Sequence, residues 1–379
     1  MSEQKNILLI CVNKFNEIGG IETYNKKLIQ IIEKYFRNVN IDIFLPCVSS
    51  DKKNLDEKYN GLYQYYVNNI KTKNTYINFI LSSIYSKYRL KKLLNKKKYD
   101  LIINSTNYYF KKIANWNNYF FVQHFNFEYY QSKFEKGFIS FTKRIIKNLI
   151  GANCPINKNK NLILFDENNK ELYFKLFNKN SSNISCIPLC TEQEQILDIE
   201  YKTLHRKNII FFGRLVIQKN IKNLIEINND IDKIDFFGSI SQTKYGKEVF
   251  EILKKRNWYK GILNSNSLYE TINKYKFSIN YSLYEGFPFS VVESLACGVP
   301  AIIKDSFTSA SFLTSYDKRL LIPKDATIKE ATHQINSLLN LKDEEYCELC
   351  KKALNFFKQN LSYEIFEKKW LEIFNKFLE

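Results

Sequence analysis

The sequence lacks the patterns that would assign it to several large classes of protein. No apolar run reaches the roughly 18 residues that a membrane-spanning helix requires. The first apolar stretch is not followed by the G-x-G-x-x-G turn of dinucleotide oxidoreductases. There is no internal repeat and no low-complexity linker. These absences argue against a membrane-spanning protein, a dinucleotide-dependent oxidoreductase and a repeat array.

The eight cysteines show no arrangement typical of disulfides or metal sites. No secretory signal precedes them, since Met1 runs straight into a short apolar strand, so we expect reduced and mostly buried thiols in the cytoplasm. Cys347 and Cys350 have C-x-x-C spacing, but they lie in a helical pattern without a second pair or a nearby His. We therefore interpret them as structural rather than as zinc ligands.

Composition and charge favour a globular protein with anionic partners. A chain of 379 residues, 45% hydrophobic and 16% aromatic, is long enough for two domains with substantial cores. The net charge of +18 favours partners such as phosphates, acidic lipids or nucleic acid. Residues 1–200 carry 30 Lys and Arg against 18 Asp and Glu, so most of the surplus lies in the first half.

Apolar strands alternate with amphipathic helices along the whole chain, which predicts an α/β protein with doubly wound parallel sheets. Strands are expected at 6–12, 39–45, 100–103, 119–123, 161–165, 184–187, 208–212, 234–238, 258–263, 277–281 and 299–303. Helices are expected at 22–36, from the Lys219 segment to about 227, and at 247–256, 268–275, 328–339 and 344–359. Glu192–His205 is polar and is interpreted as a linker. The predicted domains are 1–195 and 206–360, with a closing helix at 361–379 that crosses back toward the first domain.

The stretch Tyr281–Asp305 places Glu285 at the end of a strand and Glu293 in the first turn of a helix for which Ser290 is the expected N-cap. The carboxyl edge of an open α/β sheet is where ligands bind, and free amides at a helix start favour phosphate. Two carboxylates can accept hydrogen bonds from hydroxyl groups, and a nucleotide sugar carries both hydroxyl groups and phosphates, so the pattern suits such a ligand. The alternative is that Glu285 caps a turn and Glu293 is a surface residue.

Three further groups are candidates for the same site. Gly213-Arg214-Leu, with Lys219 five residues after Arg214, follows a strand and offers a planar fork of donors beside a point charge for phosphate oxygens. Gly19 and Gly20 form the turn between the first strand and the first helix. His124 ends the fourth predicted strand, where a lone His is more often structural than catalytic.

Taken together, E-G-F-P-x-S-x-x-E-x-x-A-x-G-x-P over residues 285–300, the G-R-L segment with Lys219 and the G-G-x-E loop resemble the signature of family 4 glycosyltransferases, retaining enzymes of the GT-B fold. The resemblance implies two Rossmann-like domains facing across a cleft, with the donor mainly on the second and the acceptor mainly on the first. Two departures are Asn220 in place of a glycine and Pro188-Leu-Cys-Thr191 in place of Pro-Asn-Gly.

The same resemblance implies the role of each site residue. Arg214, Lys219, Glu285 and His124 are expected to be catalytic. Arg214 and Lys219 would neutralise the diphosphate, Glu285 would hold donor-sugar hydroxyls, Glu293 would hold the ribose, and His124 would contact the donor sugar. The other expected substrate-binding residues are Gly19, Gly20, Gly213, Gly238, Gly286, Phe287, Pro288, Phe289 and Ser290.

The implied reaction is transfer of a hexosyl or N-acetylhexosaminyl unit from a UDP- or GDP-sugar, with retention and without cofactor or metal. The expected acceptor is a growing, lipid-linked cell-surface glycan, because Tyr76–Leu94 and Phe138–Ile150 read as basic amphipathic helices suited to the inner face of the cell membrane. The alternative is that these helices pack on the sheet and their lysines are simply solvated. Other functions left open are a GT-B epimerase or phosphorylase, or a noncatalytic nucleic-acid or anion binder, although no nucleic-acid motif is present and nucleic acid is not an expected partner.

Overall fold

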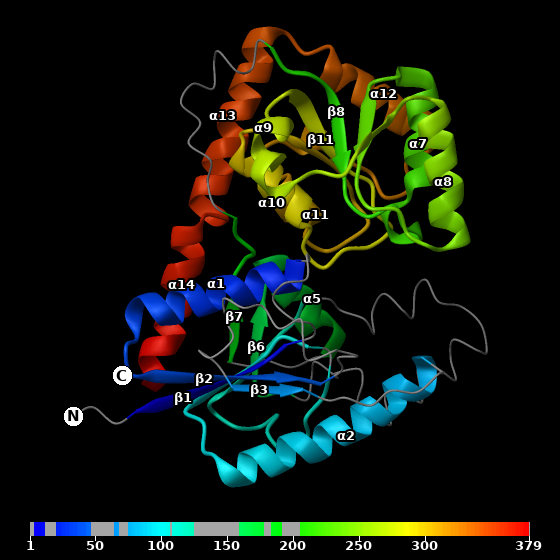
Figure 1. Ribbon diagram of the computed structural model, residues 1–379. Helices are drawn as coiled ribbons and strands as arrows, with labels where there is room; N and C mark the ends of the chain where they lie inside the picture. The colour runs from blue at the N-terminus through cyan, green and yellow to red at the C-terminus, as the bar shows by residue number, and fades with distance from the viewer. Residues whose placement is uncertain are drawn as a thin grey trace. The chain divides into compact units, whose positions relative to one another are not determined.

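The chain forms two compact units in the computed structural model (Figure 1). The structure describes residues 4–11, 20–46, 64–67, 75–106, 108–124, 159–177, 183–191 and 205–378. The first unit comprises Met1–Ile187 together with Glu367–Glu379, and the second comprises Pro188–Phe366. No helix in the described ranges is both long enough and apolar enough to cross a membrane.

The first unit is built on a seven-stranded parallel sheet with the order β3-β2-β1-β4-β5-β6-β7. Its strands are β1 (Lys5–Ile10), β2 (Val39–Leu45), β3 (Gln64–Val67), β4 (Leu101–Asn104), β5 (Tyr119–Val122), β6 (Asn161–Leu164) and β7 (Ile184–Cys186). Most are continuous apolar runs, because helices cover both faces of a parallel sheet. Figure 1 shows α1 (Gly20–Tyr35) on one side of this sheet and α2 (Thr75–Lys96) on the other. Helix α5 (Glu167–Phe177) connects β6 to β7.

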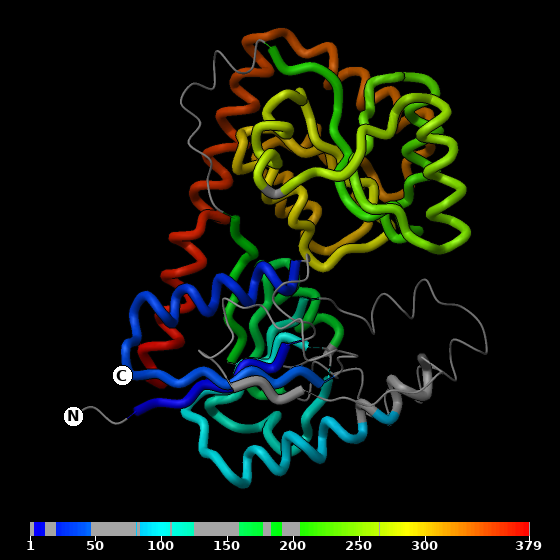
Figure 2. The backbone as a smooth tube through the Cα atoms, viewed as in Figure 1, coloured from blue at the N-terminus to red at the C-terminus, as the bar shows by residue number. Residues whose placement is uncertain are grey.

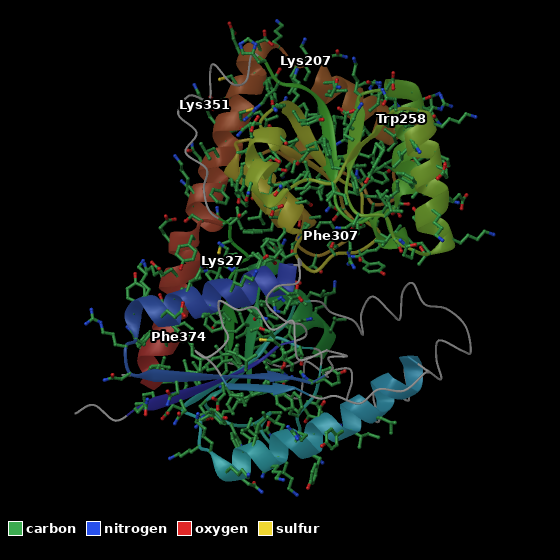
Figure 3. The ribbon with its side chains drawn as sticks, in the orientation of Figure 1. Lys27, Lys207, Trp258, Phe307, Lys351 and Phe374 are labelled. Atoms are coloured by element: carbon green, nitrogen blue, oxygen red, sulfur yellow. The ribbon has the colours of Figure 1, made fainter. Side chains whose placement is uncertain are left out.

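The last helix, α14 (Tyr363–Leu378), begins in the second unit, and its residues from Glu367 onward belong to the first. Trp370 is fully buried there, with its ring 6.3 Å from that of Tyr24 on α1. Figure 3 shows Phe374 on α14 beside α1, where its ring lies 6.0 Å from that of Phe36. Lys369 Nζ donates a 2.7 Å hydrogen bond to the carbonyl of Cys186 on β7. These contacts attach the end of the chain to the first unit.

The second unit is built on a six-stranded parallel sheet with the order β10-β9-β8-β11-β12-β13. Its strands are β8 (Lys207–Phe212), β9 (Ile234–Phe237), β10 (Tyr259–Gly261), β11 (Tyr275–Asn280), β12 (Ala301–Lys304) and β13 (Leu321–Ile322). The α-helices are α7 (Ile221–Ile231), α8 (Lys244–Lys255), α9 (Leu268–Ile272), α10 (Phe289–Ala296), α11 (Ala310–Leu313), α12 (Ile328–Leu339) and α13 (Asp343–Asn360). Short 3₁₀ turns are η4 (Ile217–Lys219), η5 (Ser265–Ser267) and η6 (Lys318–Leu320).

Helices again cover both faces of this sheet. Figure 1 shows α7, α8 and α12 on one side and α9, α10 and α13 on the other, and Figure 2 follows the backbone through the same two layers. The core on the first side includes Ile209, Leu224 and Val249, all with no exposed surface. The prediction of doubly wound parallel sheets is therefore confirmed.

Several local predictions differ from the structure. Strands β3 and β13 and helices α5 and α11 were not predicted, because each is short or begins with polar residues. Helix α7 extends to Ile231 rather than ending near Ile227, and Asp232 closes it in the left-handed conformation. Trp258 Nε1 donates to Asp232 Oδ1 at 2.6 Å, so this carboxylate has a structural role. The predicted helix Phe138–Ile150 lies outside the described residues.

Candidate functional site in the second unit

The order of strands in the second sheet determines where a ligand could bind. The chain runs from β8 outward to β9 and β10, then returns to β11 on the other side of β8. Strands β8 and β11 are therefore neighbours whose connections leave in opposite directions, and ligands in open α/β sheets bind at the carboxyl ends of such a pair. The segments that follow these two strands are Gly213–Lys219 and Tyr281–Pro288, which carry the two strongest sequence motifs.

The two loops are joined by hydrogen bonds through Gln218. Its carbonyl accepts from the amide of Leu283 at 2.8 Å, and its side-chain Nε2 donates to the carbonyl of Tyr284 at 3.0 Å. The hydroxyl of Ser306, which follows β12, donates to the carbonyl of Ser282. Ser282, Leu283 and Tyr284 lie outside any strand or helix, so these contacts satisfy their backbone groups and fix the loops against each other.

Glu285 lies at the centre of this arrangement and accepts from three donors. Its Oε1 forms an ion pair with Lys219 Nζ and accepts a 2.7 Å hydrogen bond from Ser282 Oγ. Its Oε2 accepts from Gln218 Nε2 at 3.3 Å. The side chains of Lys219 and Glu285 are only 15% and 9% exposed. An ionised carboxylate has about four acceptor positions, so about one remains for a further donor such as a sugar hydroxyl.

The loops after β8 and β9 meet at two glycines. A Cβ on Gly238, whose φ is +146°, would lie 1.7 Å from the carbonyl oxygen of Gly213. No side chain fits at that distance, so a residue other than glycine at 238 would displace the turn that begins the Arg214–Lys219 segment. The Gly238 amide also donates to the carbonyl of Gly261 at 2.8 Å, and its carbonyl accepts from the hydroxyl of Tyr259 at 3.0 Å.

Arg214 and Lys219 differ in their surroundings although they share one loop. The Arg214 side chain is exposed and makes no ion pair or side-chain hydrogen bond with any residue that the structure describes. Lys219 is held by Glu285, and the following residue, Asn220, adopts a left-handed conformation with φ 55°. Asn tolerates this region better than most residues, so it preserves the backbone that a glycine would otherwise supply.

Helix α10 begins two residues earlier than an N-cap at Ser290 would place it. Pro288 occupies the N-cap position, with no side-chain cap, and the helix starts at Phe289. Glu293 is therefore the fifth residue and lies one turn into the helix rather than in its first turn, and it is partly buried. Gly298 follows the helix with φ 59°, as expected for a C′ glycine.

The Gly-Phe-Pro turn before α10 is anchored to the unit rather than extended into solvent. Phe287 is 6% exposed, and its ring lies 6.4 Å from that of Phe312. The carbonyl of Gly286 accepts from Ser309 Oγ at 3.3 Å. This packing holds the start of α10, whose first amides have no partner within the helix and therefore favour an anion.

The remaining predicted site residues belong to the first unit. Gly20 is the exposed first residue of α1, and Gly19 lies outside the described residues. His124 follows β5, and its ring lies 4.9 Å from Tyr24 and 5.6 Å from Phe165. Burial lowers the pKa of His124 to about 3, so its imidazole is neutral near pH 7. Its Nε2 is buried and has no hydrogen-bond partner among the described residues.

Sequence reasoning missed two residues that complete the Glu285 cluster, Gln218 and Ser282. Gln218 immediately precedes the predicted Lys219, and Ser282 lies three residues before Glu285. A polar residue adjacent to a motif is a weak signal by itself. Only the parallel pairing of β8 with β11 brings the two loops to one carboxylate.

Comparisons with known proteins agree with this description. Residues 192–355, which contain both loops, match the family model described as Glycosyl transferases group 1. No curated protein matches the sequence significantly. The predicted likeness to glycosyltransferases is thereby confirmed, whereas the finer assignment to family 4 stays a prediction.

Solved structures share the fold across nearly the whole chain. The sucrose-phosphate synthase of Thermosynechococcus elongatus superposes with a TM-score of 0.75 at 16% identity, covering 98% of each chain. WaaG, a glycosyltransferase involved in lipopolysaccharide biosynthesis, gives 0.72 at 11% identity, covering 97% of this chain and 99% of that one. Anabaena HepE in complex with UDP and glucose gives 0.63 at 13% identity, covering 98% and 100%. These likenesses establish the two-domain GT-B fold.

Proposed function

We propose that this chain, a GT-B protein whose residues 192–355 match the glycosyl transferases group 1 family, is a retaining hexosyl- or N-acetylhexosaminyltransferase that uses a nucleoside diphosphate sugar. The observation that carries the proposal is the Lys219–Glu285 pair at the carboxyl ends of β8 and β11. It places a cation and a carboxylate at the topological switch point, where open α/β sheets take their ligands.

The cations of the loop after β8 suit a diphosphate leaving group. Arg214 has an exposed guanidinium whose planar donors can bind two phosphate oxygens. Lys219 supplies a second positive charge in a largely buried position, where electrostatic interactions are stronger than in water. Together they would stabilise the charge that develops on the diphosphate, which a divalent metal does in other transferases. The proposed reaction therefore needs no metal.

The carboxylates suit the hydroxyl groups of the donor. Glu285 would accept from a hydroxyl of the transferred sugar through its remaining acceptor position, and Glu293 would accept from the ribose. The start of α10, at Phe289 and Ser290, would face a phosphate. Because three donors already hold Glu285, it is a poor nucleophile. We favour front-face displacement, in which the departing phosphate accepts the proton of the attacking hydroxyl and the anomeric configuration is retained.

The first unit would bind the acceptor; its Gly20 would let the backbone approach the substrates, and its His124 would contact the donor sugar. A neutral His124 can exchange a hydrogen bond with a sugar hydroxyl but cannot neutralise phosphate. Similar folds occur in WaaG, named for lipopolysaccharide biosynthesis, and in TarM, whose bound ligands include UDP and α-GlcNAc-glycerol. These neighbours support a growing, lipid-linked cell-surface glycan as acceptor, reached from the cytoplasmic face of the membrane. The proposal includes both UDP and GDP as the nucleotide of the donor.

A donor screen tests the proposal. Release of UDP or GDP would be followed for a panel of nucleotide sugars in EDTA, for the wild type and for Lys219→Met and Glu285→Gln. One donor is expected to be turned over without metal, and each substitution is expected to lower the rate by about 10²–10³. The stereochemistry of the transferred sugar would be read by NMR, with retention expected.

Lys222→Met is the matched control. Lys222 lies three residues after Lys219 and is half exposed, paired with Glu248 on α8, so its loss should leave turnover unchanged. Absence of turnover and of binding for every nucleotide sugar would refute the transferase proposal. Turnover that EDTA abolishes would refute metal independence alone.

A further inference from the structure

Helix α2 is fixed on the first unit by one of its faces. Leu90 and Leu93 are 2% and 6% exposed and pack in the core beside β1 and β4. Ser86 Oγ donates a 2.5 Å hydrogen bond to the carbonyl of Pro46, and Lys97, just beyond the helix, pairs with buried Asp42 at 2.9 Å. These contacts determine which side of α2 points away from the sheet.

The outward side of α2 carries a row of exposed apolar and aromatic side chains. Leu81, Ile84, Tyr85 and Tyr88 are 42%, 54%, 39% and 60% exposed, and their spacing of three, four and seven residues places them on one helical face. They are four of the ten large hydrophobic side chains that are exposed in the described part of the chain. The rings of Tyr85 and Tyr88 lie 6.3 Å apart. Such concentration on one surface is typical of an interaction site.

The same face continues into a basic surface toward the C-terminal end of the helix. Residues 75–98 contain seven Lys and Arg and no Asp or Glu. Lys91, Lys92 and Lys96 are exposed, and Lys97 is the one cation of this set with an ion pair among the described residues. Lys112 adds to the surface, since its Nζ donates to Asn95 Oδ1 at 3.2 Å. We call the exposed side chains of residues 81–98, together with Lys112, the α2 face.

We propose that the α2 face is a docking surface for a bilayer that contains anionic lipids. The apolar row would enter the boundary between headgroups and acyl chains, and the lysines would lie among the lipid phosphates. The guanidinium of Arg89 lies 5.9 Å from the centre of the Tyr85 ring, a combination suited to the headgroup level. The surplus of cations without acids supplies the charge complementarity. The proposal goes beyond sugar transfer and stands whether or not the chain transfers sugars.

A bilayer explains both halves of the face better than a soluble polyanion does. Phosphodiesters or polyphosphate would use the lysines but leave Leu81 and Ile84 in water. A neutral apolar partner would contact the apolar row but gain nothing from the exposed lysines. A bilayer has an apolar interior for the aromatic and aliphatic row and an anionic headgroup layer for the lysines. Binding to it requires no ligand-shaped cavity.

Vesicle co-sedimentation of the full chain tests the proposal. Binding would be measured on vesicles of phosphatidylcholine alone and on vesicles that also contain about 30% phosphatidylglycerol, which imitate a leaflet rich in anionic lipids. We expect binding to the anionic vesicles and little to the neutral ones. Lys91→Glu/Lys92→Glu should weaken binding about 25-fold or more, since each cation contributes about fivefold. Ile84→Ser/Tyr88→Ser should weaken it about tenfold, because it removes the inserted apolar groups.

The matched control is Lys254→Glu/Lys255→Glu, an exposed consecutive pair at the end of α8 in the second unit, with the same change in net charge. It should bind as the wild type does. Equal weakening by this control would mean that total charge, not the α2 face, drives binding, and would overturn the proposal. Wild-type binding to heparin but not to anionic vesicles would also overturn it. All four side chains changed on α2 are exposed, so melting temperature should not change, and donor turnover measured in parallel separates this result from the transferase proposal.

Discussion

The Lys219–Glu285 pair allows stability and catalysis to be separated by a double-mutant cycle. The two side chains are 15% and 9% exposed, and Ser282 and Gln218 also hold the carboxylate. Removing one partner of a fully buried pair typically costs about 3–5 kcal/mol, because the other charge is left without compensation. The residual exposure here reduces this, so Glu285→Gln should lower the free energy of unfolding by about 2–3 kcal/mol.

The other single variant should be less harmful to stability. Lys219→Met leaves Glu285 with two neutral donors, so we expect a loss of about 1–2 kcal/mol in the free energy of unfolding. The double variant removes both charges together. It should therefore be about as stable as Glu285→Gln alone or more so, which corresponds to a coupling energy of about 1–2 kcal/mol between the two residues.

The rate of catalysis, unlike stability, should not recover in the double variant. Each single variant should lose about 10²–10³ in the rate of nucleotide release, and the double variant should recover none of it, since both groups act on the donor. Urea unfolding followed by circular dichroism gives the stabilities, and nucleotide release gives the rates. Additive stability losses would refute the pairing, and a double variant that regains turnover with its stability would refute the catalytic role.

Three further predictions follow from single positions. Gly238→Ala should lower the melting temperature strongly, by an amount equivalent to about 3 kcal/mol or more, because its Cβ would lie 1.7 Å from the carbonyl of Gly213; Gly261→Ala, whose Cβ meets nothing within 4 Å, should cost less. For His124, a pKa of about 3 when folded against about 6.5 when unfolded means that its stabilising contribution is complete above pH 6.5 and is lost as pH falls. Between pH 7.5 and pH 5 the free energy of unfolding of the wild type should therefore fall by about 2 kcal/mol more than that of His124→Phe. Asn220→Gly should raise the free energy of unfolding measured in urea by about 1 kcal/mol, because φ 55° suits glycine and the buried Asn220 Nδ2 has no partner in the described part of the chain. A loss of stability would refute this interpretation.

The parallel sheets and most elements could be predicted because local signals agreed with the tertiary structure, whereas the order of the strands was not predicted. Helix α12 was predicted with the right bounds, and the structure shows a capping box in which Thr327 and Glu330 satisfy each other's backbone groups. The strands of the second unit are apolar runs bounded by glycine or polar residues, which is the pattern of a strand buried on both faces. Such signals are local, so a sequence is sufficient to find them.

The start of α10 shows where local signals mislead. Ser290 is a favoured N-cap type, but Pro288 has the extended backbone that ends the preceding turn, and the helix begins directly after it. Helix α5 was missed although Asp166 Oδ1 accepts from the amide of Asn169 at 2.8 Å, because its first residues are polar and resemble a loop. Both errors concern how a chain enters a helix, where two local preferences compete.

The candidate site was only partly predictable for a different reason. Arg214, Lys219 and Glu285 could be named from their motifs, but the contacts of Glu285 with Gln218 and Ser282 depend on β8 and β11 being neighbours. Asn220 looked like a departure from the family pattern, yet its left-handed backbone preserves the expected turn. A motif identifies the residue types, whereas the sheet topology determines which of them meet.

The most direct test of the central claim is the affinity of the full chain for UDP and GDP in EDTA, measured by titration calorimetry on the wild type, Lys219→Met and the control Lys222→Met. If the loops after β8 and β11 form the donor site, one nucleotide should bind without metal, Lys219→Met should weaken it about 10- to 100-fold, and Lys222→Met should not change it. Equal binding by all three proteins, or no binding of either nucleotide, would contradict the assignment of this site.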